Sequence, residues 1–270
     1  MLEEVKKAFN RQSEMFDLYE EQNEILKRMR TVVREHLLRH LKNDDRILEL
    51  NAGTGIDAIY LAEKGFHVHT IDLSEGMLNK LEAKINSYGL KDKISFELLS
   101  FTELDKLLKN NFDYIFSNFG GLNCVEDLSE ATKHFNKILK PEGRLTFVIM
   151  PPLSLWEIAL ALKGKFNPAF RRLHKNGTVA NIEGIKFTTY YHSLQKLKHT
   201  LGRDFNLIEV QGLASISPPP YADKFPKHHP QLYKMLCGID DGASHFFPFN
   251  RCADHYIATF KFTPERLSQK

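Results

Sequence analysis

Residues 47–55 read Ile-Leu-Glu-Leu-Asn-Ala-Gly-Thr-Gly, an apolar run that leads directly into two closely spaced glycines. The apolar run predicts a buried strand, and residues 56–64 have the apolar spacing of a helix. Glycines at such a junction let the backbone approach a ligand, because no Cβ atom stands in the way. The stretch therefore predicts a ligand-binding turn inside an α/β domain.

Strands and helices are predicted to alternate around this turn. The strands are expected at 46–50, 66–71, 94–98, 112–117 and 144–149, and the helices at 56–64, 74–88, 102–108 and 128–139. Ser74 is a suitable N-cap, and Gly89 a suitable end, for the second of these helices. The alternation predicts a doubly wound, mostly parallel sheet with helices on both faces.

The segments outside this region are less regular. Residues 1–45 form a predicted helical arm without Gly or Pro, and 46–150 form the predicted cofactor-binding core of a single domain, 1–270. Beyond it we expect a strand at 185–191, a helix at 192–201, and strands at 205–210 and 252–262. Two segments rich in Pro and aromatic residues, 151–186 and 212–250, are predicted lid insertions.

The glycine turn and an acidic residue at the end of the next strand together point to an adenosine-containing cofactor. Asp72 ends the second predicted strand, where an acid can accept hydrogen bonds from ribose hydroxyls. Residues 53–58, Gly-Thr-Gly-Ile-Asp-Ala, match the dinucleotide pattern G-x-G-x-x-A, so an NAD-dependent oxidoreductase stays open. Glu49, however, suits the cationic ammonium of S-adenosylmethionine (SAM) better than a pyrophosphate. The long arm, which can cover the site, also favours SAM.

Four motifs together resemble those of the class I SAM-dependent methyltransferases. They are residues 48–55, Leu-Glu-Leu-Asn-Ala-Gly-Thr-Gly; 71–78, Ile-Asp-Leu-Ser-Glu-Gly-Met-Leu; 112–118, Phe-Asp-Tyr-Ile-Phe-Ser-Asn; and 139–143, Leu-Lys-Pro-Glu-Gly. The resemblance implies a seven-stranded sheet with an antiparallel last strand. Asn51 departs from it, because the family has a glycine there, but Asn tolerates a positive φ angle.

The resemblance also implies which residues bind SAM. Glu49 would hold the methionyl amino group, and Asp72 would bind the ribose. The other expected contacts are the turn residues Asn51, Ala52, Gly53 and Gly55; Leu73, Met77, Ser100 and Phe101 around the adenine; Asn118 and Phe119 near the sulfonium; and Tyr19 of the arm, which would close over SAM.

The acceptor side is harder to predict. Methyl transfer is an in-line displacement that mainly requires alignment and exclusion of water, and a base only where the acceptor must lose a proton early. Tyr191, His192 and His245 are the predicted catalytic residues. Asp254 and His255 are neighbours on the last predicted strand, so we expect them to point to opposite faces and form no dyad.

The expected acceptor is a small molecule. After the fourth strand, residues 117–120 are Ser-Asn-Phe-Gly rather than Asn-Pro-Pro-aromatic, which speaks against methylation of an amino group on a base or amide. The 151–186 segment places Trp156 and two Phe residues beside basic ones, and could hold an acidic or aromatic acceptor or form a solvated basic face. The expected function is methylation of an oxygen or nitrogen of this acceptor. An RNA or protein methyltransferase and an inactive SAM-binding module stay open.

Composition limits the partners and the compartment. The hydrophobic fraction of 42% supports a full core, and the net charge of +3 is too small to indicate nucleic acid. The three Cys form no C-x-x-C pair, and no ligand spacing predicts a metal. The charged N-terminus lacks a signal sequence, and Pro151, Pro152 and Glu157 interrupt the most apolar stretch, so we expect a cytoplasmic protein without a transmembrane segment. The sequence predicts no oligomeric state.

Overall fold

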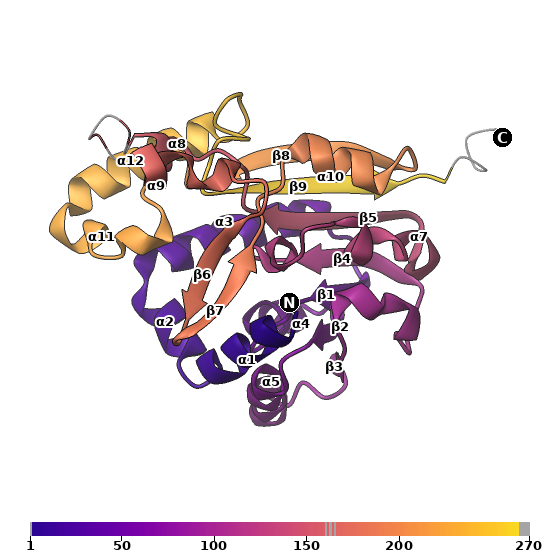
Figure 1. The fold of residues 1–270 in the computed structure, drawn as a ribbon. Helices are drawn as coiled ribbons and strands as arrows, with labels where there is room; N and C mark the ends of the chain where they lie inside the picture. The colour runs from indigo at the N-terminus through magenta and orange to yellow at the C-terminus, as the bar shows by residue number, and fades with distance from the viewer. Residues whose placement is uncertain (1, 160, 162–163, 165, 265–270) are drawn as a thin grey trace.

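A computed structural model describes residues 2–159, 161, 164 and 166–264 (Figure 1). Its main sheet has seven strands in the order β3-β2-β1-β4-β5-β9-β8. The strands are β1 (Arg46–Leu50), β2 (His67–Asp72), β3 (Ile94–Leu98), β4 (Phe112–Ser117), β5 (Leu139–Ile149), β8 (Phe205–Leu213) and β9 (His255–Phe262). Strands β1 to β5 pair in parallel, whereas β9 is antiparallel to both β5 and β8. The predicted fold class is confirmed.

Helices bury both faces of this sheet. One face packs against α3 (Glu24–His40), α4 (Ile56–Glu63) and α5 (Glu75–Tyr88). The other packs against the 3₁₀ helix η1 (Phe101–Lys106), α6 (Ser129–Thr132), α7 (Phe135–Ile138) and α10 (Leu194–Leu201). Neighbouring residues of β1, Ile47 and Leu48, belong to opposite cores, as the alternation of side chains along a strand requires. The predicted helix at 128–139 is divided between α6 and α7.

The N-terminal arm is helical but not continuous. It consists of α1 (Leu2–Gln12), α2 (Phe16–Gln22) and α3. Asn23 separates the last two, since its side-chain oxygen accepts hydrogen bonds from the backbone of Ile25 at 3.0 Å and Leu26 at 3.1 Å and so begins a new helix. The arm therefore bends over the end of the sheet instead of extending from it.

A hairpin, of which the sequence predicted only the second strand, covers the same end of the molecule. Strands β6 (Thr178–Ile182) and β7 (Ile185–Thr189) form a separate antiparallel pair joined by Glu183 and Gly184. Both turn residues have positive φ angles, 49° and 83°, so a Glu takes a position that Asn or Asp more often occupies. Phe187 packs with α1 in a small apolar cluster, and the hairpin lies beside α1 and α2 in Figure 1.

The remaining helices gather at the other side of the arm, where α8, α9, α11 and α12 lie together in Figure 1. They are α8 (Leu155–Ile158), α9 (Phe166–Phe170), η4 (Arg171–Leu173), η5 (Pro220–Ala222), α11 (Phe225–His228) and α12 (Pro230–Ala243), with η2 (Gly121–Cys124) following β4. Trp156 joins the two predicted lid segments, because its indole donates to the carbonyl oxygen of Ile216 at 3.0 Å. Residues 160, 162–163 and 165 of the first segment lie outside the described residues. Among the helices of the described chain, none is long and apolar enough to cross a bilayer.

Candidate functional site

A cavity of about 220 Å³ lies at the carboxyl ends of β1, β2 and β4, beneath the N-terminal arm. Most of the residues that the sequence assigned to a cofactor line it: Glu49, Asn51, Ala52, Gly53, Asp72, Leu73, Met77, Phe101, Asn118 and Phe119. The rest of the lining was not predicted and comes largely from the arm: Val5, Phe9, Phe16, Glu20, Leu26, Arg30, Ile56, Asp57, Gly121 and Cys124. The edge of a parallel sheet thus forms the floor of the cavity, and α1, α2 and α3 form its roof.

The turn after β1 is held in a tight left-handed path. Asn51, Gly53 and Gly55 have φ angles of 56°, 55° and 78°. Asn51 adopts the conformation that the family's glycine would take, and its amide donates to the Ser117 hydroxyl at 2.9 Å. Gly55 faces away from the cavity: a Cβ atom there would lie 2.1 Å from Cδ1 of Leu81. Its bare backbone therefore serves the packing of α4 against α5.

Asp72 joins the turn to the cavity. Its carboxylate accepts hydrogen bonds from the backbone nitrogen of Gly53 at 2.9 Å and of Ser74 at 2.8 Å. Burial raises the pKa of Asp72, and these backbone bonds act against that shift. A carboxylate offers about four lone-pair positions. Asp72 can therefore fix the turn and still accept hydrogen bonds from a ligand.

Glu49 is the most deeply buried acid on the cavity floor, with 2% of its surface exposed. Its Oε2 atom has no hydrogen-bond partner among the described residues. Burial raises the pKa of Glu49 well above its ordinary value, and the nearby Asp57 charge adds to the shift. Leaving such an oxygen without a partner costs stability. The position therefore suits a cationic ligand group, which would pair the oxygen and favour the ionised carboxylate.

A buried network of charges closes the roof. The Arg30 guanidinium donates to Glu20 at 2.6 Å, also contacts Asp57, and lies 4.7 Å above the Phe119 ring. Asp57 further accepts from Arg34 at 2.9 Å and from Asn118 at 2.7 Å. Although burial acts in the opposite direction, the two arginines hold the pKa of Asp57 below its ordinary value. The network ties α2 and α3 to the turn and to the end of β4.

This network was not predicted from the sequence. Asp57 lies inside the quoted glycine motif, but its partners are on the arm, at positions 20, 30 and 34. The one available signal was a buried-face position of an amphipathic helix occupied by an arginine, Arg30. A charged residue at such a position requires a buried partner.

Besides Gly55, two predicted cofactor contacts, Tyr19 and Ser100, are absent from the cavity lining in the described residues. The Tyr19 side chain is exposed, and its hydroxyl donates to Glu183 of the hairpin turn at 2.9 Å. Ser100 begins η1, where its hydroxyl accepts from the Thr102 backbone at 3.2 Å. Of the arm residues, Phe16 and Glu20 rather than Tyr19 face the cavity. Tyr19 instead joins the arm to the hairpin.

The predicted catalytic residues are absent from the cavity lining found in the described part of the chain. The Tyr191 hydroxyl is 2.9 Å from that of Thr178. His192 is fully buried, its Nε2 lies 2.9 Å from the Val125 carbonyl oxygen, and burial lowers its pKa to about 4. His245 is half-exposed, with Nδ1 3.6 Å from Glu209 of β8. The three side chains form no common site.

The expectation that Asp254 and His255 could not form a dyad is wrong. Strand β9 begins only at His255, so strand alternation does not govern Asp254, and its Oδ2 lies 2.9 Å from His255 Nδ1. Arg172 donates to the other oxygen at 2.8 Å. Burial of Asp254 opposes ionisation, but His255 and Arg172 together hold its pKa at about 2.

The Nε2 atom of His255, for which the described residues show no hydrogen bond, lies beside the loop that follows β4. Its ring meets Phe119 edge-on at 5.9 Å, and Nε2 would lie 3.5 Å from a Cβ atom built on Gly120. Phe119 and Gly121 both line the cavity. A neutral imidazole whose Nδ1–H is held by a carboxylate presents its Nε2 lone pair to a proton donor. The dyad therefore stands where a base for an acceptor would be useful.

Comparison with known proteins shows which families and chains this protein is similar to. Residues 47–143 match the family model of a methyltransferase domain. A demethylmenaquinone methyltransferase of Leptospira interrogans is 30% identical over 145 residues, which cover 52% of this chain and 57% of that protein. The chain thus spans little more than half the length of this curated relative.

Solved structures share the fold over most of the chain. A SAM-dependent methyltransferase from Methanosarcina mazei superposes with a TM-score of 0.58 and 19% identity, over 85% of this chain and 97% of that one. The 1,6-didemethyltoxoflavin N1-methyltransferase of Burkholderia thailandensis gives a TM-score of 0.58 and 14% identity, over 97% and 89% of the two chains. At these identities the likeness establishes the fold.

Proposed function

We propose that this chain, which belongs to the class I SAM-dependent methyltransferases, moves the methyl group of SAM to an oxygen or nitrogen of a small-molecule acceptor. The observation that carries the proposal is the pair of carboxylates in one roofed cavity. Glu49 offers a buried oxygen without a partner in the described residues, and Asp72 stands at the end of the neighbouring strand. The sulfonium of SAM supplies a methyl group already activated for displacement.

The residues present fit SAM along its length. Glu49 would pair with the amino group of SAM, and Asp72 would accept hydrogen bonds from the ribose hydroxyls. Leu73, Met77 and Phe101 give an apolar wall for the adenine. Burying the cavity under the arm excludes water, which strengthens each of these polar contacts. A dinucleotide would instead bring its pyrophosphate near Glu49, where two like charges would meet.

On the acceptor side we propose His255 as the base, oriented by Asp254. This assignment replaces Tyr191, His192 and His245, because only His255 combines a carboxylate partner with a ring next to Phe119. His255 would remove the proton of an acceptor hydroxyl or protonated amine as the methyl group transfers. The oxygen or nitrogen of the acceptor would then attack the methyl carbon in line, and S-adenosylhomocysteine would leave with the electron pair of the broken carbon–sulfur bond.

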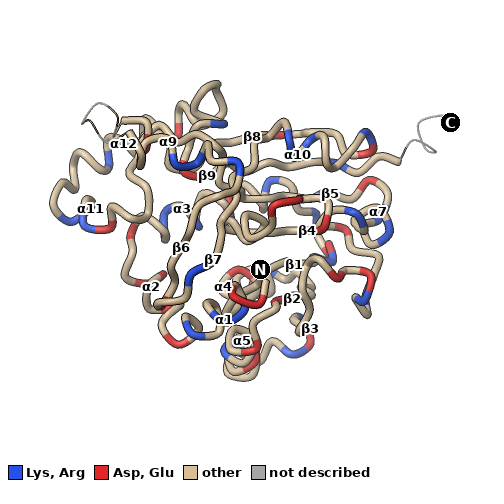
Figure 2. The backbone as a smooth tube through the Cα atoms, viewed as in Figure 1, with Lys and Arg blue, Asp and Glu red and all other residues tan. Residues whose placement is uncertain are grey.

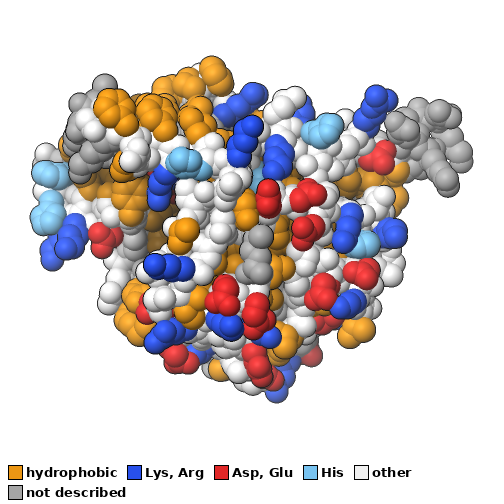
Figure 3. Space-filling model, in the orientation of Figure 1, with side chains coloured by type: hydrophobic (Ala, Val, Ile, Leu, Met, Phe, Trp, Pro, Cys, Tyr) orange, Lys and Arg blue, Asp and Glu red, His pale blue; other side chains and the backbone are white. Residues whose placement is uncertain are grey.

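A small-molecule acceptor agrees with the charge of the surface. Figure 2 shows acidic and basic residues interspersed along the chain, and the face in Figure 3 carries both signs side by side. An RNA-binding face would be basic over a continuous area. Two of the similar proteins are named for demethylmenaquinone and 1,6-didemethyltoxoflavin, which are small molecules. We propose a cytoplasmic location for the same activity.

Calorimetry with SAM and with NAD tests the cofactor. We expect SAM to bind with one site per chain and NAD to give no heat of binding. Binding of NAD without binding of SAM would reverse the proposal in favour of an oxidoreductase.

Labelled SAM tests the acceptor class. The protein is incubated with the methyl-labelled cofactor and with the small-molecule, RNA and protein fractions of a cell extract in separate reactions. Label is expected in the small-molecule fraction. Transfer confined to RNA or protein would refute the acceptor class, and binding of SAM with no transfer to any fraction would favour an inactive module.

A further inference from the structure

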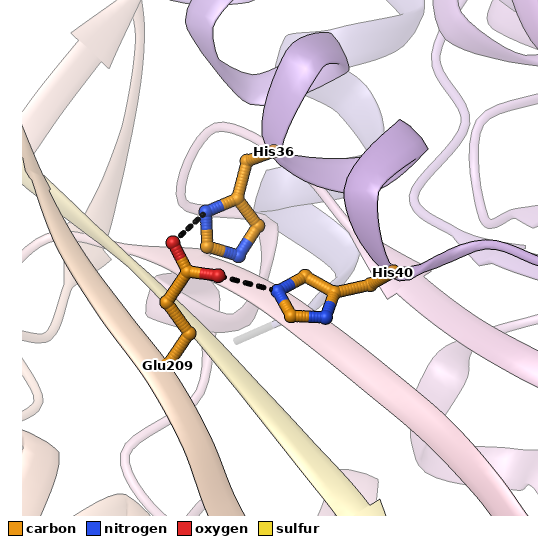
Figure 4. A group of neighbouring side chains, drawn as sticks. All are labelled: His36, His40 and Glu209. Atoms are coloured by element: carbon orange, nitrogen blue, oxygen red, sulfur yellow. Dashed lines mark hydrogen bonds and ion pairs between the residues drawn. The ribbon is translucent and has the colours of Figure 1, made fainter.

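Two histidines and a glutamate converge on the outer side of the sheet, where α3 crosses β8 (Figure 4). His36 and His40 are four residues apart on α3, so they lie on the same face of the helix, and Glu209 comes from β8. Their candidate ligand atoms all lie within 4.8 Å of one another. His40 Nε2 is 2.6 Å, and His36 Nδ1 3.6 Å, from the Glu209 carboxylate. The expectation that no residues have metal-ligand spacing overlooked this pair.

The ring of His36 is oriented from behind. Its Nε2 lies 2.8 Å from the Thr259 hydroxyl, which is itself 2.6 Å from that of Thr146. When Nε2 carries the proton and donates it to Thr259, the lone pair is on Nδ1, which faces Glu209 and lies 3.0 Å from the side-chain oxygen of Gln211. An outer hydrogen bond of this kind fixes the tautomer of histidines that bind metals.

A cation already occupies the point of convergence. The Arg39 guanidinium lies 2.8 Å from Glu209 Oε1 and 3.3 Å from both His36 Nδ1 and the Gln211 oxygen. Nearly half of its side chain, 48%, is exposed to solvent. Because several lone pairs meet at one place, the position requires a positive charge. Arg39 is held there only at its tip and can turn outward.

We propose that His36, His40 and Glu209 bind a Zn²⁺ ion at the position of the Arg39 tip. Two imidazole nitrogens and one carboxylate are a ligand set that zinc accepts, with a fourth position open. His245 can fill it, since its Nδ1 is 3.6 Å from Glu209 and its side chain is half-exposed. The ion would fasten the carboxyl-terminal half of α3 to β8. Because α3 also carries Arg30 and Arg34, this site would hold the roof of the cavity in place.

Titration of the chelator-treated protein with Zn²⁺ by calorimetry tests the site, and Co²⁺ serves as a spectroscopic probe. We expect one equivalent to bind, with the visible absorption bands of tetrahedral Co²⁺. His40→Ala and Glu209→Gln should each weaken binding by about 10-fold or more. His228→Ala, at an exposed histidine beside His229, is the matched control and should leave the affinity unchanged.

The Arg39→Ala variant distinguishes a metal site from a purely structural network. Because Arg39 is half-exposed, its replacement should leave the core intact. Removing the competing guanidinium should tighten Zn²⁺ binding. The proposal is overturned if the wild-type protein binds no Zn²⁺, if binding survives both His40→Ala and Glu209→Gln, or if Arg39→Ala weakens it. The readout needs no methyl acceptor, so it stands or falls independently of the proposed activity.

Discussion

Glu49 shows how one buried side chain links the sequence to a ligand. Its place at the end of an apolar strand was enough to predict that it reaches the site, because side-chain direction along a strand follows from position. Its unpaired oxygen and its raised pKa come from the three-dimensional surroundings and needed the structure. Asp72 was predictable for the same reason as Glu49, whereas Arg30 and Asp57 were not, since each acquires its role from a partner distant in the chain.

Glu49 makes SAM binding depend on pH. Because burial raises its pKa in the free protein and a bound ammonium favours the ionised form, binding releases a proton. The affinity should therefore rise with pH from the ordinary glutamate range up to the raised pKa and then level off. Calorimetry in buffers of different ionisation enthalpy measures the proton release. Glu49→Gln should weaken binding by about 1.5–3 kcal/mol and reduce this pH dependence; an unchanged pH profile in the variant would count against the assignment.

Gly55 is required by packing as well as by its backbone angle. A Cβ atom there would overlap Leu81 at 2.1 Å, whereas one at Gly65, also at positive φ, would meet no atom within 4 Å. Gly55→Ala should lower the free energy of unfolding by about 1–3 kcal/mol more than Gly65→Ala does. Urea denaturation of the two variants compares them, and equal losses would show that backbone strain alone accounts for both.

Helices and strands with a regular local sequence pattern were predicted well, whereas features that depend on the surrounding structure were missed. The strands from 46 to 149 were found because their apolar runs are short and bounded by turn residues, and the caps at Ser74 and Gly89 are confirmed. Strand β6 was missed because Glu183 is an uncommon residue for its turn. The break of the arm at Asn23 was missed as well, although an Asn followed by a helix is a capping signal.

The arm depends on its buried arginine. Arg30 pairs with Glu20 and Asp57, and its side chain is only 8% exposed. Arg30→Ala should cost about 3–5 kcal/mol of unfolding free energy, because it removes the arginine that pairs with Glu20 and one of the two arginines that pair with the buried Asp57. Arg34→Ala, at a more exposed side chain, is the control and should cost less. A loss for Arg30→Ala no greater than for the control would mean that water replaces the guanidinium.

The whole molecule brings together residues from opposite ends of the chain. The cavity lining comes from the arm and the first strands, while the dyad beside it belongs to the start of β9. Only the insertion of β9 between β5 and β8 places His255 next to Phe119. The family resemblance predicted an antiparallel last strand. It did not predict which side chain at the start of this strand would lie beside the site.

Substitution of His255 should therefore reduce catalysis without changing cofactor binding. His255→Ala is expected to lower kcat by about 10²–10⁴-fold while leaving the Kd for SAM unchanged, since its ring lies beside the cofactor cavity and not in its lining. His192→Ala is the comparison, and a larger effect on kcat there than at His255 would contradict the assignment.

The proposed binding of SAM requires Glu49, the arm and the edge of the sheet to act on one ligand. A crystal structure of the protein with SAM tests it most directly. We predict the amino group within hydrogen-bonding distance of Glu49, the ribose at Asp72, and the arm closed over both. A cavity left vacant at saturating SAM, or a ribose lying away from Asp72, would contradict the account.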